Sequence, residues 1–290
     1  MRVGFLTNVL AESGVSDLKD LAAWGYENGF TDLEVGPSVD LKEDEVEKIK
    51  SSGTIDISAL TYCRNFLDPN SEMAEYYKSN IIKRIELAGE FNIEKVLCST
   101  GVSKDAYDGV RFNPMKSIEA SVEFLKVMVE KAEENNVTLC IENCPLMGNI
   151  GISPYMWDEI FSRIDSDKLK LAYDPSHLIW QFIDPYIPIL EFGHKIGHVH
   201  AKDTEINYTT LRRTGILFNP KNGEIDSSGW WRYRVPGLGE LDWNKFIDHL
   251  NQVGFDGTIS IEHEDPVWDG TQEKVKAGLI RGQKYLKQFI

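Results

Sequence analysis

A regular alternation between short apolar runs and longer segments with helical spacing is the feature that most constrains how this chain folds. The longer segments place apolar residues at intervals of three and four, as in Asp17–Asn28, Met73–Phe91 and Pro114–Glu134. The short runs are typical of buried strands: Val3–Leu6, Asp32–Val35, Ile55–Leu60, Lys95–Cys98, Thr138–Ile141, Lys170–Tyr173, Gly197–His200 and Gly257–Ile261. Eight strands alternating with helices predict a closed parallel (β/α)8 barrel, the TIM barrel, as a single domain over residues 1–290.

The alternative architecture is a doubly wound open sheet. A sheet of that kind binds its ligand at a topological switch beside a glycine-rich turn. No early strand-like run in this sequence is followed by such a turn, and its absence favours the barrel.

One segment, residues 204–241, interrupts the alternation and contains no expected barrel element. Loops of this length in compact domains usually serve a function. Because the segment follows the seventh strand, we expect it to lie over the C-terminal face, where barrels keep their active sites. Its candidate substrate-binding residues are Trp230, Trp231, Arg232 and Arg234. Such side chains bind sugar rings, hydroxyls or phosphate, but they are also enriched at subunit interfaces, so a homo-oligomer contact is the alternative.

Four predicted strands end in side chains that do not belong in an apolar core: Glu142, Asp174, His200 and Glu262. Buried charge requires a partner, and the ends of neighbouring strands converge at one face of a barrel. Together these residues would form one metal-ligand set of three carboxylates and an imidazole. Such a set suits a hard divalent cation, so Mn2+ is expected, with Mg2+ or Co2+ as alternatives. Zinc would prefer more nitrogen or sulfur.

Further polar residues accompany these strand ends. His177 follows Asp174 by three residues, and we expect it to contact substrate or support a ligand. Lys202 follows His200 by two residues, which places it beside a polarised oxygen unless an ion pair with Glu264 or Asp265 holds it. The early strands supply candidate substrate-binding residues: Glu34, Arg64 and Asn65. Glu34 is expected either to orient a ligand or substrate hydroxyl or to form a structural ion pair.

The charge balance narrows the possible partners. The chain has 31 Lys and Arg against 46 Asp and Glu, a net charge of −15. Nucleic-acid binding needs a basic surface, so neither nucleic acids nor anionic membranes are expected to bind. No run approaches the roughly 20 apolar residues of a membrane span, and the N-terminal run is too short for a signal peptide. The four cysteines are expected to be buried free thiols, which fits a cytoplasmic protein.

Taken in order, several motifs resemble the xylose-isomerase-like barrel superfamily, in its sugar phosphate isomerase/epimerase branch. They are Ala59-Leu60-Thr61-Tyr62, Asn65-Phe66-Leu67-Asp68-Pro69, Ile141-Glu142-Asn143, Asp174-Pro175-Ser176-His177-Leu178, His200-Ala201-Lys202-Asp203 and Ile261-Glu262. The likeness covers nearly the whole chain. The ordered set is specific for the superfamily rather than for one reaction.

The resemblance implies a metal held by Glu142, Asp174, His200 and Glu262, with His177 contacting substrate. It also implies that Glu142 and Glu262 lie on opposite faces of a ketose or keto-sugar. One glutamate would remove a proton next to a carbonyl and the other would return it, through an enediolate that the metal stabilises. The expected function is therefore a metal-dependent sugar isomerase or epimerase.

Several alternatives stay open. The His-x-Lys-Asp element also resembles inosose dehydratases, in which the same proton abstraction is followed by loss of hydroxide. A third reading is a non-catalytic carbohydrate-binding barrel. The superfamily's three-zinc DNA-repair endonucleases are disfavoured, because such a cluster needs several histidines and this chain has none before His177. The loop arginines would suit a phosphate, whereas its aromatic residues favour an unphosphorylated sugar or a keto-glycoside.

Overall fold

A closed ring of eight parallel strands forms the centre of the computed structural model, which describes residues 1–107, 111–146, 148–217 and 229–290. The ring consists of β1 (Arg2–Leu6), β2 (Asp32–Val35), β3 (Asp56–Thr61), β4 (Lys95–Cys98), β5 (Thr138–Glu142), β6 (Leu169–Tyr173), β7 (Ile196–Ala201) and β10 (Thr258–Ile261). Its spatial order is β1-β10-β7-β6-β5-β4-β3-β2, and the pairing of β1 with β10 closes it. The predicted TIM barrel is confirmed, and each barrel strand begins and ends within one residue of its predicted run.

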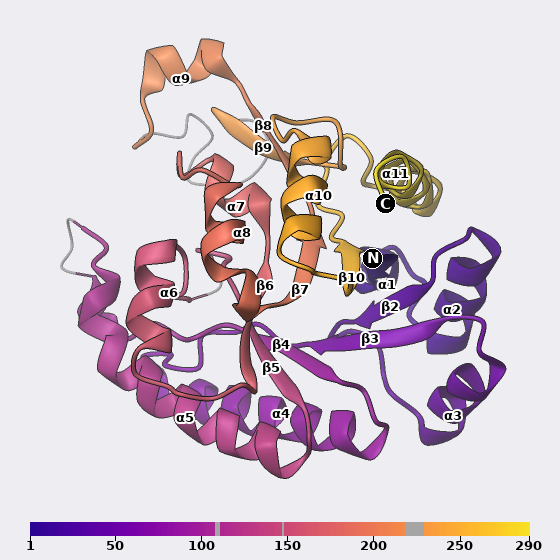
Figure 1. The fold of residues 1–290 in the computed structure, drawn as a ribbon, viewed down its shortest axis with the longest axis horizontal. Coiled ribbons are helices and arrows are strands. Elements are labelled where there is room, and N and C mark those ends of the chain that lie inside the picture. Colours follow the sequence, from indigo (N-terminus) through magenta and orange to yellow (C-terminus); the bar gives the residue numbers. More distant parts are fainter. Residues whose placement is uncertain (108–110, 147, 218–228) are drawn as a thin grey trace.

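Helices surround the ring (Figure 1). They are α1 (Asn8–Glu12), α2 (Leu18–Glu27), α3 (Glu43–Ser52), α4 (Ser71–Glu90), α5 (Ile118–Glu134), α6 (Pro154–Phe161), α7 (Pro175–Ile179), α8 (Ile187–Phe192), α10 (Trp243–Gln252) and α11 (Gln272–Leu286). Short 3-10 turns occur at η1 (Lys104–Ala106), η2 (Pro114–Ser117) and η3 (Gly193–Lys195). The predicted helix Pro114–Glu134 is therefore a 3-10 turn followed by α5. In the part of the chain that the structure describes, no helix is both long and apolar enough to cross a membrane.

Alternation along the strands separates two apolar layers. Four apolar residues that face the inside of the barrel form a cluster of their own: Ala59, Leu97, Cys140 and Ala172. The residues that alternate with them pack outward against the helices in one large core. All four cysteines are free and buried, as predicted. Glu142 ends β5 and Asp174 follows β6, so the candidate site lies at the C-terminal strand ends.

The segment predicted as a loop over residues 204–241 contains regular structure. An antiparallel pair forms between β8 (Asp203–Ile206) and β9 (Trp231–Arg234), and α9 (Tyr208–Thr214) follows β8. These elements project beyond the barrel strands (Figure 1), while residues 218–228 lie outside the described part of the chain. We call the elements β8, α9 and β9 the β8–β9 excursion.

Asp203 ties the return of the excursion to the barrel. Its buried carboxylate accepts hydrogen bonds from the backbone N–H groups of Gly237 and Leu241, each at 3.1 Å, and from Trp243 Nε1 at 3.0 Å. A Cβ atom added at Gly239 would lie 2.3 Å from Asp203 Oδ1, so glycine is needed there for the close approach. Asp203, the first residue of β8, thus holds the segment that returns from β9 to α10.

Candidate metal centre

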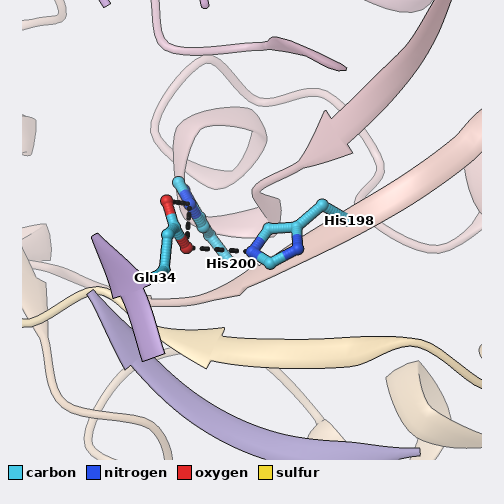
Figure 2. Close-up of side chains that lie close together, drawn as sticks. All are labelled: Glu34, His198 and His200. Carbon is cyan, nitrogen blue, oxygen red and sulfur yellow. Dashed lines mark hydrogen bonds and ion pairs between the residues drawn. The ribbon is translucent and has the colours of Figure 1, made fainter. Parts of the chain in front are cut away.

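Glu34, at the end of β2, fixes the orientation of two histidines on β7. Its Oε1 lies 3.0 Å from His200 Nε2, and its Oε2 lies 2.9 Å from His198 Nε2 (Figure 2). The Thr61 hydroxyl donates a short hydrogen bond to the same carboxylate. Glu34, His198 and His200 are fully buried. Both Glu34 oxygens are engaged, so the structure gives it an orienting position and not an exposed place for a substrate hydroxyl.

The other ring nitrogen of His200 faces the strand ends. Its Nδ1 atom lies 3.3 Å from Glu142 Oε1 and 3.2 Å from Glu262 Oε2. Glu142 ends β5 and Glu262 follows β10, so the two carboxylates approach the imidazole from strands on either side of β7. A carboxylate behind the ring and two in front of it is the arrangement of a metal-binding histidine with its outer support.

The two carboxylate oxygens of Asp174 have different surroundings: one caps a helix and the other faces the candidate site. Oδ1 accepts a hydrogen bond from the Ser176 backbone N–H at 2.8 Å and so caps α7. Asn143 holds the Asp174 backbone at both ends, because its Oδ1 accepts from Asp174 N–H at 2.7 Å and its Nδ2 donates to Asp174 C=O at 2.8 Å. The second oxygen, Oδ2, is buried and has no hydrogen-bond partner among the described residues.

A set of donor atoms therefore converges at one point. Ligand atoms of Glu142, Asp174, His177 and Glu262 all lie within 4.8 Å of one another, and His200 Nδ1 borders two of these carboxylates. All four predicted ligands are brought together, with His177 as a fifth candidate. His177 Nε2, like Asp174 Oδ2, is buried and lacks a hydrogen-bond partner in the described structure. The two atoms lie 3.3 Å from each other, within ion-pair distance. Buried polar atoms that lack hydrogen bonds are costly, and a divalent cation among these oxygens and nitrogens would supply the missing interaction.

Lys202 occupies the rim of the centre. Its Nζ lies 2.6 Å from Glu262 Oε2, 2.9 Å from Glu264 Oε2 and 3.3 Å from Asp174 Oδ2. Both readings made from the sequence apply to its position, because it lies beside the site carboxylates and also pairs with Glu264. Asp265 is engaged elsewhere, by Arg234.

Two contacts of the site had no sequence signal. The Tyr233 hydroxyl, on β9, lies 2.9 Å from His177 Nδ1, and its ring lies 4.4 Å from Lys202 Nζ. The Cys63 thiol donates to Glu142 Oε2 at 3.3 Å. Tyr233 lies in a segment that looked irregular in the sequence, and Cys63 follows β3 between Tyr62 and Arg64, so neither could be placed without the fold.

Nearby cationic groups keep Glu142 and Glu262 ionised. Burial alone would raise the pKa of Glu142, but His200 and His177 hold it well below its usual range. Burial opposes ionisation of Glu262 as well, but Lys202 and His200 together outweigh it and lower the pKa of Glu262 to about 2. The pKa of His200 is raised well above its usual value, because Glu34, Glu262 and Glu142 outweigh its burial. The metal-free centre is therefore a network of paired opposite charges.

The two tryptophans of the excursion that were expected to bind substrate pack against other aromatic rings. Trp230 and Trp231 are only 5% and 7% exposed. Trp231 stacks on Trp180 at 4.6 Å between centroids and Trp230 stacks on Phe182 at 5.8 Å. Ring stacking therefore occupies both indoles, and their expected contact with a sugar stays a prediction. The rings form the apolar core of the excursion, because burying them removes a large apolar surface from water.

The two arginines of β9 are held by carboxylates. Arg232 Nε donates to Glu205 Oε2 at 2.9 Å. Arg234 bonds the same glutamate and donates through Nε to Asp265 Oδ2 at 2.8 Å. These pairs fasten β9 to β8 and to the segment after β10. Both guanidinium groups are thus already committed to carboxylates, which leaves them poorly placed to hold a substrate phosphate.

Arg64 and Asn65 also lie apart from the metal ligands. Asn65 Oδ1 accepts from the backbone N–H of Val102 at 2.8 Å, so this side chain joins the loop after β3 to the loop after β4. Arg64 Nη1 donates to the Cys63 carbonyl, and its guanidinium lies 5.2 Å from the centre of the Tyr62 ring. Neither is seen in contact with the carboxylates described above.

The fold and the site define a (β/α)8 barrel whose carboxylates and imidazoles meet at the C-terminal strand ends, where barrel enzymes keep their active sites. The comparison with known families agrees: residues 19–289 match the xylose isomerase-like TIM barrel, and the chain belongs to that family. It is similar to the uncharacterized protein YfiH of Bacillus subtilis (strain 168), with 27% identity over 324 residues, 100% of this chain and 99% of the relative.

Other relatives carry functional names. The inosose dehydratase of Lacticaseibacillus casei is 26% identical over 136 residues, but the match spans only 44% of this chain and 41% of that enzyme. Among solved structures, the IOLI protein with a binding zinc atom has a TM-score of 0.76 at 18% identity, covering 100% of this chain and 99% of that one. A D-tagatose 3-epimerase-like protein has a TM-score of 0.72 at 20% identity, covering 100% and 97%. At these identities the structures show a shared fold.

Proposed function

We propose that this protein is a divalent-metal-dependent enzyme that isomerises or epimerises a ketose or another keto-sugar. The observation that carries the proposal is the position of His200 Nδ1, 3.3 Å from Glu142 Oε1 and 3.2 Å from Glu262 Oε2. Two glutamates from separate strands face one another across a metal-binding nitrogen. This is the geometry needed to hold an ion and to reach a substrate from two sides.

The residues that would hold the ion are Glu142, Asp174, His200 and Glu262, with His177 adjacent. A bound divalent ion would supply Lewis-acid stabilisation of negative charge that develops on a substrate oxygen. The donor set is rich in carboxylate oxygen, so Mn2+ is the ion we expect to bind, with Mg2+ or Co2+ as substitutes. A zinc atom is bound in the IOLI structure, which shares this fold, and this supports a divalent ion here without fixing its identity or its ligands.

Proton transfer is assigned to Glu142 and Glu262. Both carboxylates are ionised at neutral pH, which is the state that a base requires. Because they approach from β5 and β10, one can accept a proton from a carbon next to the carbonyl while the other delivers a proton to the opposite face. Glu142 is 5% exposed, so its surroundings contain little water to compete for the transferred proton.

His177 and Lys202 are assigned to orienting substrate. Tyr233 fixes the imidazole of His177 through Nδ1 at 2.9 Å and leaves Nε2 facing the centre. Lys202 presents an ammonium group between Glu262 and Glu264. A hydroxyl or carbonyl oxygen entering the centre would meet these two donors at its edge.

A second reaction is favoured by the same ammonium group. A dehydratase must protonate a departing hydroxyl after the first proton abstraction, and Lys202 places a proton donor 2.6 Å from a candidate base, Glu262. The sequence relatives named inosose dehydratase support this reading over the part of the chain that they match. It shares the first chemical step with epimerisation, so the product separates the two reactions.

The test is hydrogen–deuterium exchange into a panel of keto-sugars and inososes, measured by proton NMR in D2O with Mn2+-loaded protein. We expect one substrate carbon next to a carbonyl to lose its proton signal. Glu142→Gln or Glu262→Gln should slow that exchange by roughly 100- to 10,000-fold in protein that still carries metal. The control is Glu191→Gln, an exposed glutamate of α8. A new ultraviolet-absorbing enone or dione would identify the dehydratase.

Two results would contradict the proposal. Wild-type exchange rates in both metal-loaded glutamine variants would remove the two-glutamate mechanism. Sugar binding without exchange at any carbon across the panel would instead identify a non-catalytic carbohydrate-binding barrel.

A further inference from the structure

A polar cavity of about 730 Å³ lies apart from the metal centre, between the segment that follows β2 and one face of α4. Tyr62 and Arg64 line it from the end of β3. The residue between them, Cys63, contacts Glu142 of the metal centre. Neighbouring residues of an extended chain point to opposite sides, so the cavity lies on the other side of this segment from the metal ligands, and none of those ligands lines it.

The cavity is basic although the protein carries a net charge of −15. Its lining includes four cationic side chains, Lys42, Arg64, Lys83 and Arg84, and a single acidic one, Asp40. Glu45 pairs with Lys42 at 2.9 Å. Among the residues that the structure describes, no carboxylate forms an ion pair with Arg64, Lys83 or Arg84. This contrasts with Arg232 and Arg234, whose charges are compensated by Glu205 and Asp265.

Arg84 contacts backbone carbonyls and an aromatic ring and forms no ion pair among the described residues. It is half-buried, and its guanidinium reaches only the backbone carbonyls of Val35 and Gly36, at 3.4 and 3.3 Å. The ring of Tyr62 has guanidinium groups near it on two sides, Arg64 at 5.2 Å and Arg84 at 6.0 Å from the centroid. Burial lowers the pKa of Arg84 to about 10. Two guanidinium groups therefore lie beside one ring and line the same cavity, and neither forms an ion pair with a described carboxylate.

We propose that this cavity binds the oxyanion of a small molecule, a phosphate or a carboxylate, between Arg64 and Arg84. The forked donors of two guanidinium groups match the oxygens of either anion. Lys83 adds a third charge from α4, while Tyr76 and Tyr77 supply aromatic walls for the rest of the molecule. This is a binding site in addition to the metal centre, and it does not depend on the function proposed above.

Isothermal titration calorimetry of metal-free protein tests the site, with inorganic phosphate, a hexose 6-phosphate, succinate and an unphosphorylated hexose as probes. Removing bound metal prevents the probes from binding through an ion. We expect at least one anion to bind and the hexose not to bind. Arg64→Gln and Arg84→Gln should each weaken anion binding by about tenfold or more, the scale of a lost charge-assisted hydrogen bond.

The matched control is Arg281→Gln on α11. Arg281 also places its guanidinium over an aromatic ring, 5.7 Å from the centre of Trp268, but it does not line the basic cavity. Its loss should leave anion binding unchanged, as should Glu142→Gln at the metal centre. If Arg84→Gln does not fold, Arg64→Gln together with Lys83→Gln, an exposed position, decides the matter.

The relative affinities for the probes identify the kind of anion that the cavity binds. Tighter binding of the phosphates than of succinate identifies a phosphorylated ligand, and the reverse identifies a carboxylate; either result supports the site. The proposal is overturned if no anion binds to the wild-type protein, or if the arginine variants bind as tightly as the control. Loss of binding in Glu142→Gln, with retention in the arginine variants, would place the anion at the metal centre and also overturn it.

Discussion

His200 Nε2 lies 3.0 Å from Glu34 Oε1, although the two residues are 166 positions apart and belong to strands that are not neighbours in the ring. The contact crosses the inside of the barrel. It holds the imidazole with Nδ1 directed at Glu142 and Glu262, so Glu34 sets the orientation of a residue that is proposed to bind metal.

Glu34→Gln should therefore weaken metal binding by about 10- to 100-fold, the usual effect of losing a carboxylate that supports a metal-binding histidine. Competition with a fluorescent chelator measures the affinity, and circular dichroism verifies the fold. Glu191→Gln is the matched control on the surface. An affinity within twofold of wild type would mean that Glu34 has no part in presenting His200.

Metal content distinguishes the two imidazoles of the centre. We expect about one Mn2+-class ion per chain, because several hard donors converge at one point. Elemental analysis should show its loss in Glu142→Ala and His200→Ala. His177→Ala should retain it, since His177 is assigned to substrate, and so should His194→Ala at an exposed position. Loss in His177→Ala and retention in His200→Ala would exchange the two roles.

Metal binding should release a proton at neutral pH. The pKa of His200 is raised well above its usual value in the metal-free protein, so the ring is protonated at pH 7, and its Nδ1 must lose that proton to become a ligand. Affinity should accordingly rise with pH until the pKa of His200 is passed. Calorimetry in two buffers of different ionisation enthalpy, at one pH, counts the protons. Equal apparent enthalpies would contradict the prediction.

The stacked pair Trp180 and Trp231 should stabilise the β8–β9 excursion. Trp231→Ala removes a buried ring from its core, and substitutions of this type cost about 3–5 kcal/mol. Because the excursion packs as a cluster of its own, we expect faster native-state proteolysis within residues 204–241. Tyr155→Ala, which alters a ring that is 64% exposed, is the control. Unchanged proteolysis with a raised KM would instead support a direct sugar contact.

The barrel and the convergence of its ligands could be predicted because both depend on local pattern. Apolar runs mark strands, and the residue that ends a run must lie at the C-terminal rim, so Glu142 and Glu262 could be placed near one another without knowing any contact. The structure and the family match agree with this fold. The roles of these residues in catalysis remain predictions for the exchange experiment.

Side-chain partners far apart in the sequence could not be predicted. Nothing in the sequence joins Trp231 to Trp180 or Arg234 to Asp265, so these residues resembled free groups of a loop. Arg64 was expected at the substrate, but it turns to Tyr62 and the basic cavity. In each case the residue type predicted the kind of contact, ring stacking or ion pairing. Only the fold showed which residue is the partner.

The contact between Glu34 and His200 also links the centre to the closure of the ring. If the seam between β1 and β10 opened, β2 and β7 would lie in one flat sheet with β3, β4, β5 and β6 between them. Glu34 would then leave His200, and the imidazole would lose its support. Any ligand that binds through the imidazole of His200 therefore stabilises the closed barrel by mass action. The fraction of protein with a filled centre then measures the fraction whose barrel is closed.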